Sequence, residues 1–306
     1  MRWRKRGHVY APDGSLPWAH RYAFPPTPLR LDDQTLRIYV GLCDKSTVAR
    51  IGYVDVRADD PGRIVRVSRR PVLDIGEPGC FDDNGVVPTR VLPVGDQLYL
   101  YYVGFQLGTK VPYFQFVGLA ISSDGGETFV RDRRTPVLER SDTEPVNRTA
   151  AYVSRDDDGF HIYYSGGDRW TDYDDKRLPV YNLRTLDSPD GKSWGGEGRV
   201  CIDFASDDEH VIGRPWLLPG AEPLRMLYSI RTRSDDDYRI GMAVSWDGVA
   251  WERRDDEVGI DASDDGWEGG AVAYASAVEH GERIYLFYVG RGRGTTGFGY
   301  AELESW

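Results

Sequence analysis

Apolar and polar residues alternate in short stretches along the whole chain, and one tyrosine-containing pattern recurs. Its five copies are LRIYVG at 36–41, LYLYYVG at 98–104, FHIYYSG at 160–166, LRMLYSI at 224–230 and RIYLFYVG at 283–290. Alignment on Tyr39, Tyr102, Tyr164, Tyr228 and Tyr288 gives successive separations of 63, 62, 64 and 60 residues. Aromatic and β-branched residues favour strands, so each copy predicts a strand within a unit of about sixty residues.

Further strands flank each tyrosine pattern. An apolar run precedes every copy, and a second strand pattern follows it, such as RIGYVDV at 50–56 or RIGMAVS at 239–245. Three of these second strands end in Ser-x-Asp-Gly, which is typical of a tight turn. No helical periodicity of useful length interrupts the pattern. The sequence therefore predicts an all-β fold, namely a five-bladed β-propeller.

The repeat also predicts the domain organisation, a single domain over 1–306. Its blades would span about 16–75, 76–140, 141–203, 204–262 and 263–306. The last blade lacks a fourth strand, and we expect the N-terminal segment 1–12 to supply it and close the ring. A pair of β-sandwiches or a β-solenoid is the alternative.

Charge and composition exclude several classes of function. The net charge is −11 and no basic stripe is present, which argues against nucleic-acid binding. No apolar run approaches the length of a membrane span, and no hydrophobic stretch follows the basic N-terminus. The three widely spaced cysteines do not form a disulfide framework. We expect a cytoplasmic protein without a cofactor, and no motif specifies a metal, although a channel Ca²⁺ stays open.

Acidic residues recur in register with the tyrosines. Counting back nineteen or twenty residues from each tyrosine gives His20, Asp83, Glu144, Glu209 and Glu268. In a propeller, equivalent positions of the blades converge near the axis, so this register predicts an acidic central pocket. Crowded carboxylates shift one another's pKa, as acid/base catalysis requires. Taken singly, each residue also fits an exposed turn.

Cations and aromatic residues lie near the same strand starts. The cations are Arg21, Arg148 and Arg214, which could orient a ligand, and the aromatic residues are Trp216, Trp267 and Tyr274. Aromatic rings stack on sugars, although packing in the core is the alternative. The glycine-rich GRGRGTTGFG lacks the ending of a phosphate-binding loop and predicts a wide hairpin. That Arg291 and Arg293 contact a ligand phosphate stays open.

Several segments together resemble a known superfamily. They are FDDNGVVP, GLAISSDGGETF, RPWLL, YRIGMAVSWDGVAW and GWEGGAVAYASAV…LFYVGRGRGTTGFGYA. The chain resembles the five-bladed β-propeller glycosidase superfamily, with glycoside hydrolase families 32, 43, 68 and 130, and most of all its uncharacterised bacterial relatives. In the hydrolytic families, successive blades supply an aspartate base or nucleophile, a supporting aspartate and a glutamate acid.

The resemblance implies site residues by position. Asp83 matches the supporting aspartate, and Glu144 roughly matches the acid. The first blade departs from the pattern, because LPWAHRYAFPP has no aspartate and His20 with Arg21 occupies that stretch. A retaining mechanism needs a carboxylate nucleophile, so this departure argues against the usual chemistry.

Three hypotheses follow. The first is a carbohydrate-active enzyme that acts on a glycosidic or activated sugar bond through Asp83 with Glu209 and Glu268. Arg148 and Arg214 would orient the ligand. The second is a non-hydrolytic relative that binds or rearranges a small sugar or a sugar nucleotide. The third is a protein-interaction scaffold.

Overall fold

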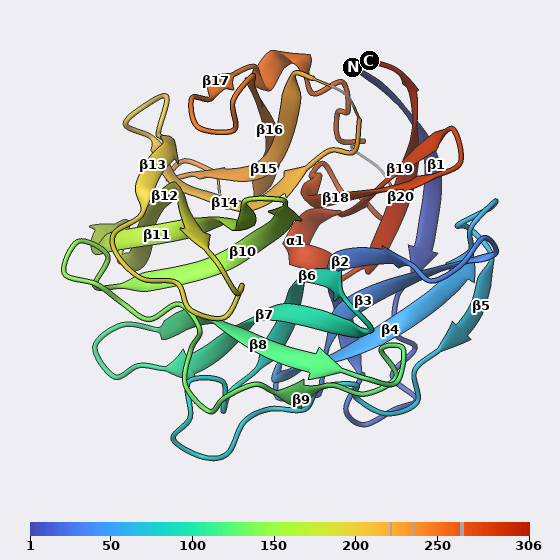
Figure 1. Cartoon of the computed structure of the whole chain (residues 1–306), viewed down its shortest axis with the longest axis horizontal. Helices are drawn as coiled ribbons and strands as arrows, with labels where there is room; N and C mark the ends of the chain where they lie inside the picture. Colours follow the sequence, from blue (N-terminus) through green and yellow to red (C-terminus); the bar gives the residue numbers. More distant parts are fainter. Residues whose placement is uncertain (221, 236, 264–265) are drawn as a thin grey trace.

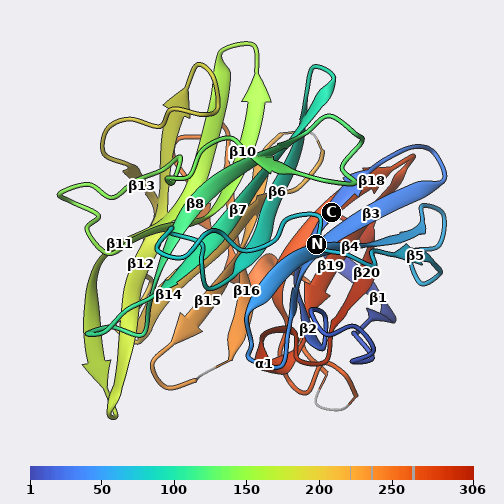
Figure 2. The same ribbon diagram turned by 90° about the horizontal axis from the view of Figure 1, so that it is seen from below.

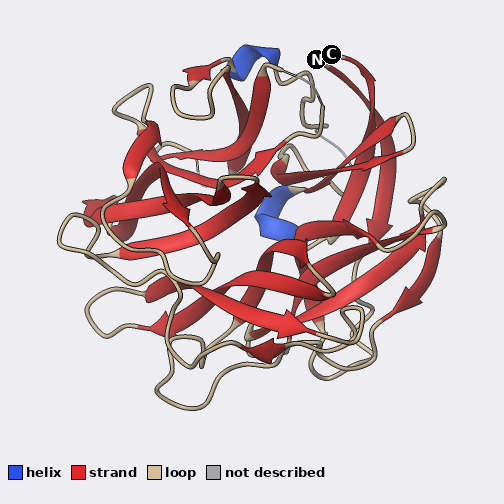
Figure 3. Cartoon of the chain, in the orientation of Figure 1, coloured by secondary structure: helices blue, strands red, loops and turns tan. Residues whose placement is uncertain are grey.

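The computed structural model describes residues 1–220, 222–235, 237–263 and 266–306, and it is almost entirely β (Figure 3). The exceptions are a 3₁₀ turn at Asp255–Glu257 and the four-residue helix α1 (Arg291–Gly294). Within the described part, no helix has the length and apolar character that crossing a membrane requires. The expected all-β class is confirmed.

The strands form antiparallel runs of four, the first four of which are each made of consecutive strands, and the second, third and fourth runs join in one twelve-stranded sheet. The first run is β2 (Arg21–Arg30), β3 (Thr35–Cys43), β4 (Ala49–Arg57) and β5 (Ile64–Val67). The second is β6 (Val86–Val94), β7 (Gln97–Leu107), β8 (Tyr113–Ser122) and β9 (Val130–Arg131). The third is β10 (Asn147–Asp156), β11 (Gly159–Tyr173), β12 (Lys176–Ser188) and β13 (Arg199–Ile202). The fourth is β14 (Glu209–Leu217), β15 (Leu224–Thr232), β16 (Tyr238–Ser245) and β17 (Glu252–Arg253). The fifth is β18 (Ala273–His280), β19 (Arg283–Val289), β20 (Phe298–Ser305) and the N-terminal β1 (Arg2–Tyr10).

The N-terminal strand belongs to the last run. β1 pairs antiparallel with β20, in a register that includes Trp3 opposite Leu303. The indole Nε1 of Trp3 also donates a 3.0 Å hydrogen bond to the carbonyl of Val258. The two chain ends therefore lie together (Figure 1), and the expected pairing of the N-terminal segment with the last strand is confirmed.

The aligned tyrosines all lie in the second strand of their run, where each is buried. The apolar core fills the spaces between neighbouring runs. Tyr39 of β3 and Leu100 of β7 share one cluster, and Leu119 of β8 and Ile162 of β11 share another. The tyrosine strands thus pack run against run.

The first strands of the runs meet in the middle of the molecule (Figure 1). β2, β6, β10, β14 and β18 contact one another in turn, and β18 contacts β2. Helix α1 packs against β2 in the same place. Figure 2 shows that β11 and β12 extend as a long hairpin beyond their neighbours. The first strands therefore bring residues from every run to one central region.

Candidate functional site

Two adjoining cavities occupy this central region. The inner cavity has a volume of about 210 Å³ and takes lining residues from all five first strands. The outer cavity, of about 500 Å³, is lined by residues of strand ends and loops, such as Tyr22, Thr47 and Asn84. Both are lined by Phe24, Phe105, Tyr113 and Arg293, so the two cavities lie next to one another.

Irregular strand pairing shapes the inner cavity. Ala150, Arg214 and Tyr274 line it, and all three have left-handed backbones with φ of 51°, 57° and 54°. The pairing register of β10, β14 and β18 shifts at these residues. Each residue lies fourteen positions before the buried tyrosine of its run. Since bulges re-aim side chains next to functional sites, this shared register identifies the cavity as the candidate site.

The two remaining first strands carry proline at the equivalent position, namely Pro25 and Pro88. Pro25 lines the inner cavity, and so do both neighbours of Pro88, which are Val87 and Thr89. Equivalent positions of the five runs therefore do converge, as the repeat predicted. The register that converges lies fourteen residues before the tyrosine, and the predicted acidic register lies five or six residues further back.

Arg214 is a buried cation in this cavity. Its guanidinium donates to backbone carbonyls of Thr89 and of Pro26, and to the Thr27 hydroxyl at 2.8 Å. Its Nε atom is buried without a hydrogen-bond partner. Burial lowers the pKa of Arg214 to about 9, and the charge of Arg90 adds to this effect. At neutral pH, Arg214 thus carries a positive charge inside the protein.

Tyrosines form one wall of the cavity. The ring of Tyr274 lies 5.1 Å from that of Tyr238 and stacks on Phe24 at 6.3 Å. Burial raises the pKa of Tyr181 and Tyr274 well above 10 and that of Tyr113 to about 12. These phenols therefore stay protonated and can donate hydrogen bonds to a ligand. Their aromatic faces can stack on a sugar ring.

The predicted carboxylates do not line either central cavity. Glu144 is fully buried and accepts hydrogen bonds from Tyr164 at 2.8 Å, from Arg148 at 2.6 Å and from Arg184 at 3.2 Å. All of these partners belong to the same run or to the loop before it. Arg148, which the sequence suggested as a ligand-orienting residue, is therefore already ion-paired with Glu144.

Glu209 and Glu268 are held in the same way. Both oxygens of Glu209 accept from Arg253, at 2.7 and 2.9 Å, and Arg239 donates at 3.0 Å. Glu268 accepts from Lys5 at 2.5 Å and from the phenol of Tyr288 at 2.7 Å. Each carboxylate binds cations of its own run, so the structure does not bring Glu144, Glu209 and Glu268 to one site.

In the second run, the buried carboxylate is Asp82 and its neighbour Asp83 is partly exposed. Asp82 accepts from the phenol of Tyr102 at 2.9 Å and from Arg131 at 2.8 Å. Asp83 accepts a hydrogen bond from the backbone of Gly79 at 2.8 Å. The equivalent of Glu144 and Glu268 is thus Asp82, which lies twenty residues before its tyrosine as they do.

The other residues predicted from the sequence lie in three places: in the inner cavity, in the packed interior, or outside both. Only Arg214 and Tyr274 line the inner cavity. Trp216 is buried and donates to the carbonyl of Ala277, and Trp267 packs on Tyr288 at 5.2 Å between ring centres. His20 and Arg21 lie at the start of β2 and bind backbone carbonyls of nearby loops, outside the lining of both cavities.

Sequence reasoning missed most of the cavity wall, including Tyr113, Tyr181, Tyr238 and Thr149. The sequence pointed to Arg293 only as an open alternative, namely as a residue of the glycine-rich segment that could contact a ligand phosphate. A signal was present, because counting back fourteen residues from each tyrosine reaches a lining residue of the inner cavity in four runs. In the second run it reaches Pro88, whose two neighbours line the cavity.

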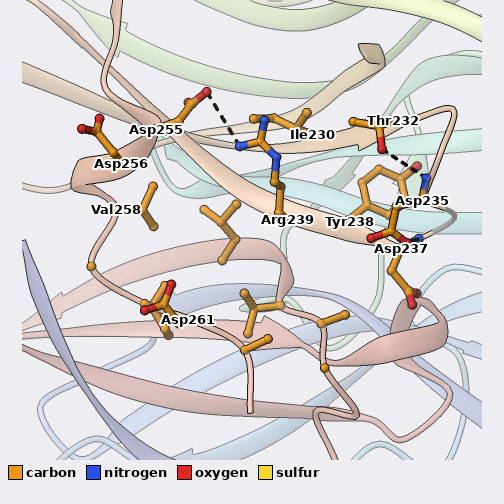
Figure 4. A pocket seen from close by; sticks show the side chains of 17 residues that line it. Ile230, Thr232, Asp235, Asp237, Tyr238, Arg239, Asp255, Asp256, Val258 and Asp261 are labelled. Atoms are coloured by element: carbon orange, nitrogen blue, oxygen red, sulfur yellow. Dashed lines mark hydrogen bonds and ion pairs between the residues drawn. The ribbon is translucent and has the colours of Figure 1, made fainter. Parts of the chain in front are cut away.

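A third cavity, of about 330 Å³, lies beside β16 and is rich in aspartates (Figure 4). Arg239 and Asp255 face one another across it at 3.9 Å. Asp237 lines this cavity and also the outer central cavity, and it binds Arg291 at 2.7 Å. Among the residues that the structure describes, no three histidines, cysteines or acidic residues are placed to hold a metal ion.

Comparison with known proteins identifies relatives of this chain. No protein-family model matches the sequence. The chain is 33% identical to the uncharacterized protein Rv1502 of Mycobacterium tuberculosis over 305 residues, covering 100% of both chains. Its homologue MT1551, from another strain of that organism, matches equally at 33% identity over 100% of both chains.

Several solved structures share the fold. A thermostable family-43 glycoside hydrolase superposes with a TM-score of 0.68 at 14% identity, covering 96% of this chain and 92% of the other. A glycosyl hydrolase from Bacteroides ovatus gives a TM-score of 0.73 at 15% identity, over 98% and 92%. A structure from work on glycoside hydrolase family 130 also gives 0.73 at 15% identity, over 98% and 93%. The chain therefore belongs to the family of Rv1502, and its fold is that of the glycoside hydrolase superfamily which its sequence resembles.

Proposed function

We propose that this protein binds a small carbohydrate in the two central cavities and does not hydrolyse it by the paired-carboxylate mechanism. The observation that carries this proposal is the lining of the inner cavity. It combines tyrosine faces with hydrogen-bond donors such as Arg214 and the protonated phenols, and its described lining contains no carboxylate. Aromatic faces with a few convergent polar groups are typical of ligand sites.

The architecture supports the same reading. We infer that each antiparallel run is one blade of a five-bladed propeller over 1–306 and that the cavities lie on its axis. The first strands contact one another in turn, with β18 next to β2. Each supplies lining residues at, or directly beside, the position fourteen residues before its tyrosine. Ligand sites of closed β-architectures commonly lie where such strands open to solvent.

The placement of the carboxylates argues against hydrolysis through Asp83, Glu209 and Glu268. Glycosidases need two carboxyl groups flanking the bond, roughly 5–5.5 Å apart for retention or 6.5–9.5 Å apart for inversion. Glu209 and Glu268 are each bound by cations of their own run. Asp237, at the outer cavity, is paired with Arg291. Binding or rearrangement of a sugar therefore fits the cavity better than its hydrolysis.

The test is calorimetric binding of a monosaccharide and sugar-nucleotide panel, with product analysis of the same mixtures. We expect saturable binding that Tyr274→Ala weakens about tenfold, because ring stacking contributes about 1 kcal/mol beyond buried area. Tyr274→Phe keeps the ring and should bind nearly as well. Trp246→Ala, at a largely exposed side chain outside both cavities, is the control.

Two results would overturn the proposal. One is unchanged binding in Tyr274→Ala when circular dichroism shows a native fold. The other is release of a hydrolysis product that Glu209→Gln abolishes while the variant remains folded. The latter result would restore the carboxylate mechanism.

A further inference from the structure

We infer that the carbohydrate bound by this protein carries an anionic group, a phosphate or a carboxylate, which Arg214 and Arg293 hold in the inner cavity. This inference rests on the proposed function and names the class of its ligand. It begins from a comparison among the buried arginines of the described chain.

Buried arginines elsewhere in the molecule are neutralised by carboxylates. Arg37 binds Asp55 at 2.7 Å, and Arg148 binds Glu144 at 2.6 Å. Arg214 is as deeply buried, but no described carboxylate forms an ion pair with it. A buried charge without a partner costs several kcal/mol or more, so such a group is expected to meet its counter-charge in a bound ligand.

Arg293 supplies a further positive charge to the same cavity, which Arg231 also lines. It lies in α1, with a left-handed backbone at φ of 59°, and its side chain lines both cavities. Among the described residues it has no hydrogen bond and no ion pair, because Asp237 binds its neighbour Arg291 instead. The strained backbone thus places a free guanidinium where the two cavities meet.

The polar atoms left over in the inner cavity are mainly donors. Among the residues that the structure describes, the Nε of Arg214 and the hydroxyl of Thr149 are buried without hydrogen-bond partners. Protonated phenols of Tyr181 and Tyr274, which interact with Tyr238, line the same space. Burying an unpaired donor is costly, and the oxygens of an oxyanion can accept hydrogen bonds from such donors.

The size of the cavities fits a charged sugar. The inner cavity, at about 210 Å³, can hold the anionic group with part of a ring, and the outer cavity, at about 500 Å³, can hold the remainder. Phe24 and Tyr274 offer their faces to a ring beside Arg214. The net charge of −11 repels polyanions in general, which favours a small ligand that reaches the buried arginines.

The experiment compares matched probes by calorimetry at low salt, namely glucose, mannose and galactose with their 6-phosphates and their uronic acids. We expect at least one anionic sugar to bind ten times more tightly than its neutral parent, with an affinity that falls as salt is added. Comparison of the sugar phosphates with the uronic acids shows whether the site binds a phosphate or a carboxylate. Inorganic phosphate is measured separately as a probe without a sugar.

The variant for this test is Arg293→Met, because its loss breaks no hydrogen bond or ion pair among the described residues. It should weaken the anionic probe about tenfold and leave the neutral parent unchanged. Arg63→Met is the control, because Arg63 is an exposed arginine that lines neither cavity. Arg214→Lys keeps the charge and should retain part of the preference for the anion.

The outcomes separate this inference from the proposed function. If neutral sugars bind as tightly as their anionic forms and Arg293→Met changes neither, the inference is overturned and the proposed function stands. If inorganic phosphate binds as tightly as every sugar phosphate, the inference of a charged sugar is overturned. If no sugar of either kind binds, both proposals fail.

Discussion

The phenol of Tyr288 donates a 2.7 Å hydrogen bond to the carboxylate of Glu268, twenty residues earlier in the chain. The same spacing joins Tyr164 to Glu144 and Tyr102 to Asp82. A cation completes each pair, and for Glu268 it is Lys5 from the N-terminal strand. In these three runs the acidic spacing therefore has a structural cause, since it ties the loop before the first strand to the buried tyrosine. In the fourth run, Tyr228 binds Asp255 and Glu209 binds Arg253 instead.

We expect Glu268→Gln to lower the free energy of unfolding by about 2 kcal/mol, because hydrogen bonds to charged groups contribute about 1.5–3 kcal/mol. Burial raises the pKa of Glu268, but hydrogen bonds from Lys5 and Tyr288 outweigh this effect and the net pKa lies below its usual 4.5. The stabilisation is therefore complete above pH 4.5 and is lost as the pH falls through the lowered value.

Urea unfolding of the wild type and of Glu268→Gln at several pH values measures this effect. The gap between the two should be constant near neutrality and shrink in acid. Glu279→Gln, at an exposed residue of β18, is the control and should change little. A gap that persists unchanged down to pH 3 would contradict the assignment.

Asp82 and Asp83, the adjacent aspartates of FDDNG, should differ in how much their substitution lowers the free energy of unfolding. We expect Asp82→Asn to cost about 3 kcal/mol, because it removes one partner of a buried ion pair with Arg131. Asp83→Asn should cost less than about 1 kcal/mol, since Asp83 accepts one backbone hydrogen bond near the surface. If instead Asp83→Asn keeps full stability and loses ligand binding, Asp83 is a site residue as the sequence predicted.

Ala150→Gly should stabilise the protein by about 0.5–1 kcal/mol. A left-handed backbone costs an alanine about 1–2 kcal/mol, and substitution by glycine removes this cost. The greater freedom of glycine in the unfolded state offsets only part of the stability gained in this way. The neighbouring Ala151 is buried and lies outside the left-handed region, so Ala151→Gly should destabilise. Thermal unfolding of the two variants compares them directly, and equal losses would show that position 150 carries no strain.

The stability contributed by His161 should change with pH in the opposite direction to that contributed by Glu268. Burial lowers the pKa of His161, but the hydrogen bonds that its ring donates to Asp156 and Asp187 dominate and raise the pKa above 6.5. Its contribution to stability is therefore full below pH 6.5 and is lost as the pH rises through the raised value. The NMR titration of His161 should show this raised pKa, and Asp156→Asn should lower it. An unshifted titration in both proteins would refute the prediction.

Much of the fold could be predicted because its signals are local. The tyrosine strands are set by short runs of aromatic and β-branched residues, and the turns by Ser-x-Asp-Gly. The side chain of Ser122, for example, accepts a hydrogen bond from the backbone of Gly126 at 2.9 Å within such a turn. The pairing of the N-terminal strand with the last run followed from counting strands, since an unpaired edge is unfavourable.

The site could not be predicted in the same way, because its composition depends on contacts between distant residues. The partners of the acidic register come from far along the chain, with Arg131 lying 49 residues from Asp82 and Lys5 lying 263 residues from Glu268. These cations satisfy the carboxylates within each run. A count along the sequence cannot show that a charge is already paired.

The sequence by itself determined the repeat, the strands and the chain-wide equivalence of positions in the five units, because these depend on patterns within about sixty residues. The tertiary structure alone decided which equivalent positions face the centre. A bulge displaces the alternation of a strand by one residue, so the left-handed turns at Ala150, Arg214 and Tyr274 change which side chains reach the cavity. That displacement places Arg214 and Tyr274 in the inner cavity, whereas Glu144, Glu209 and Glu268 are held by cations of their own runs.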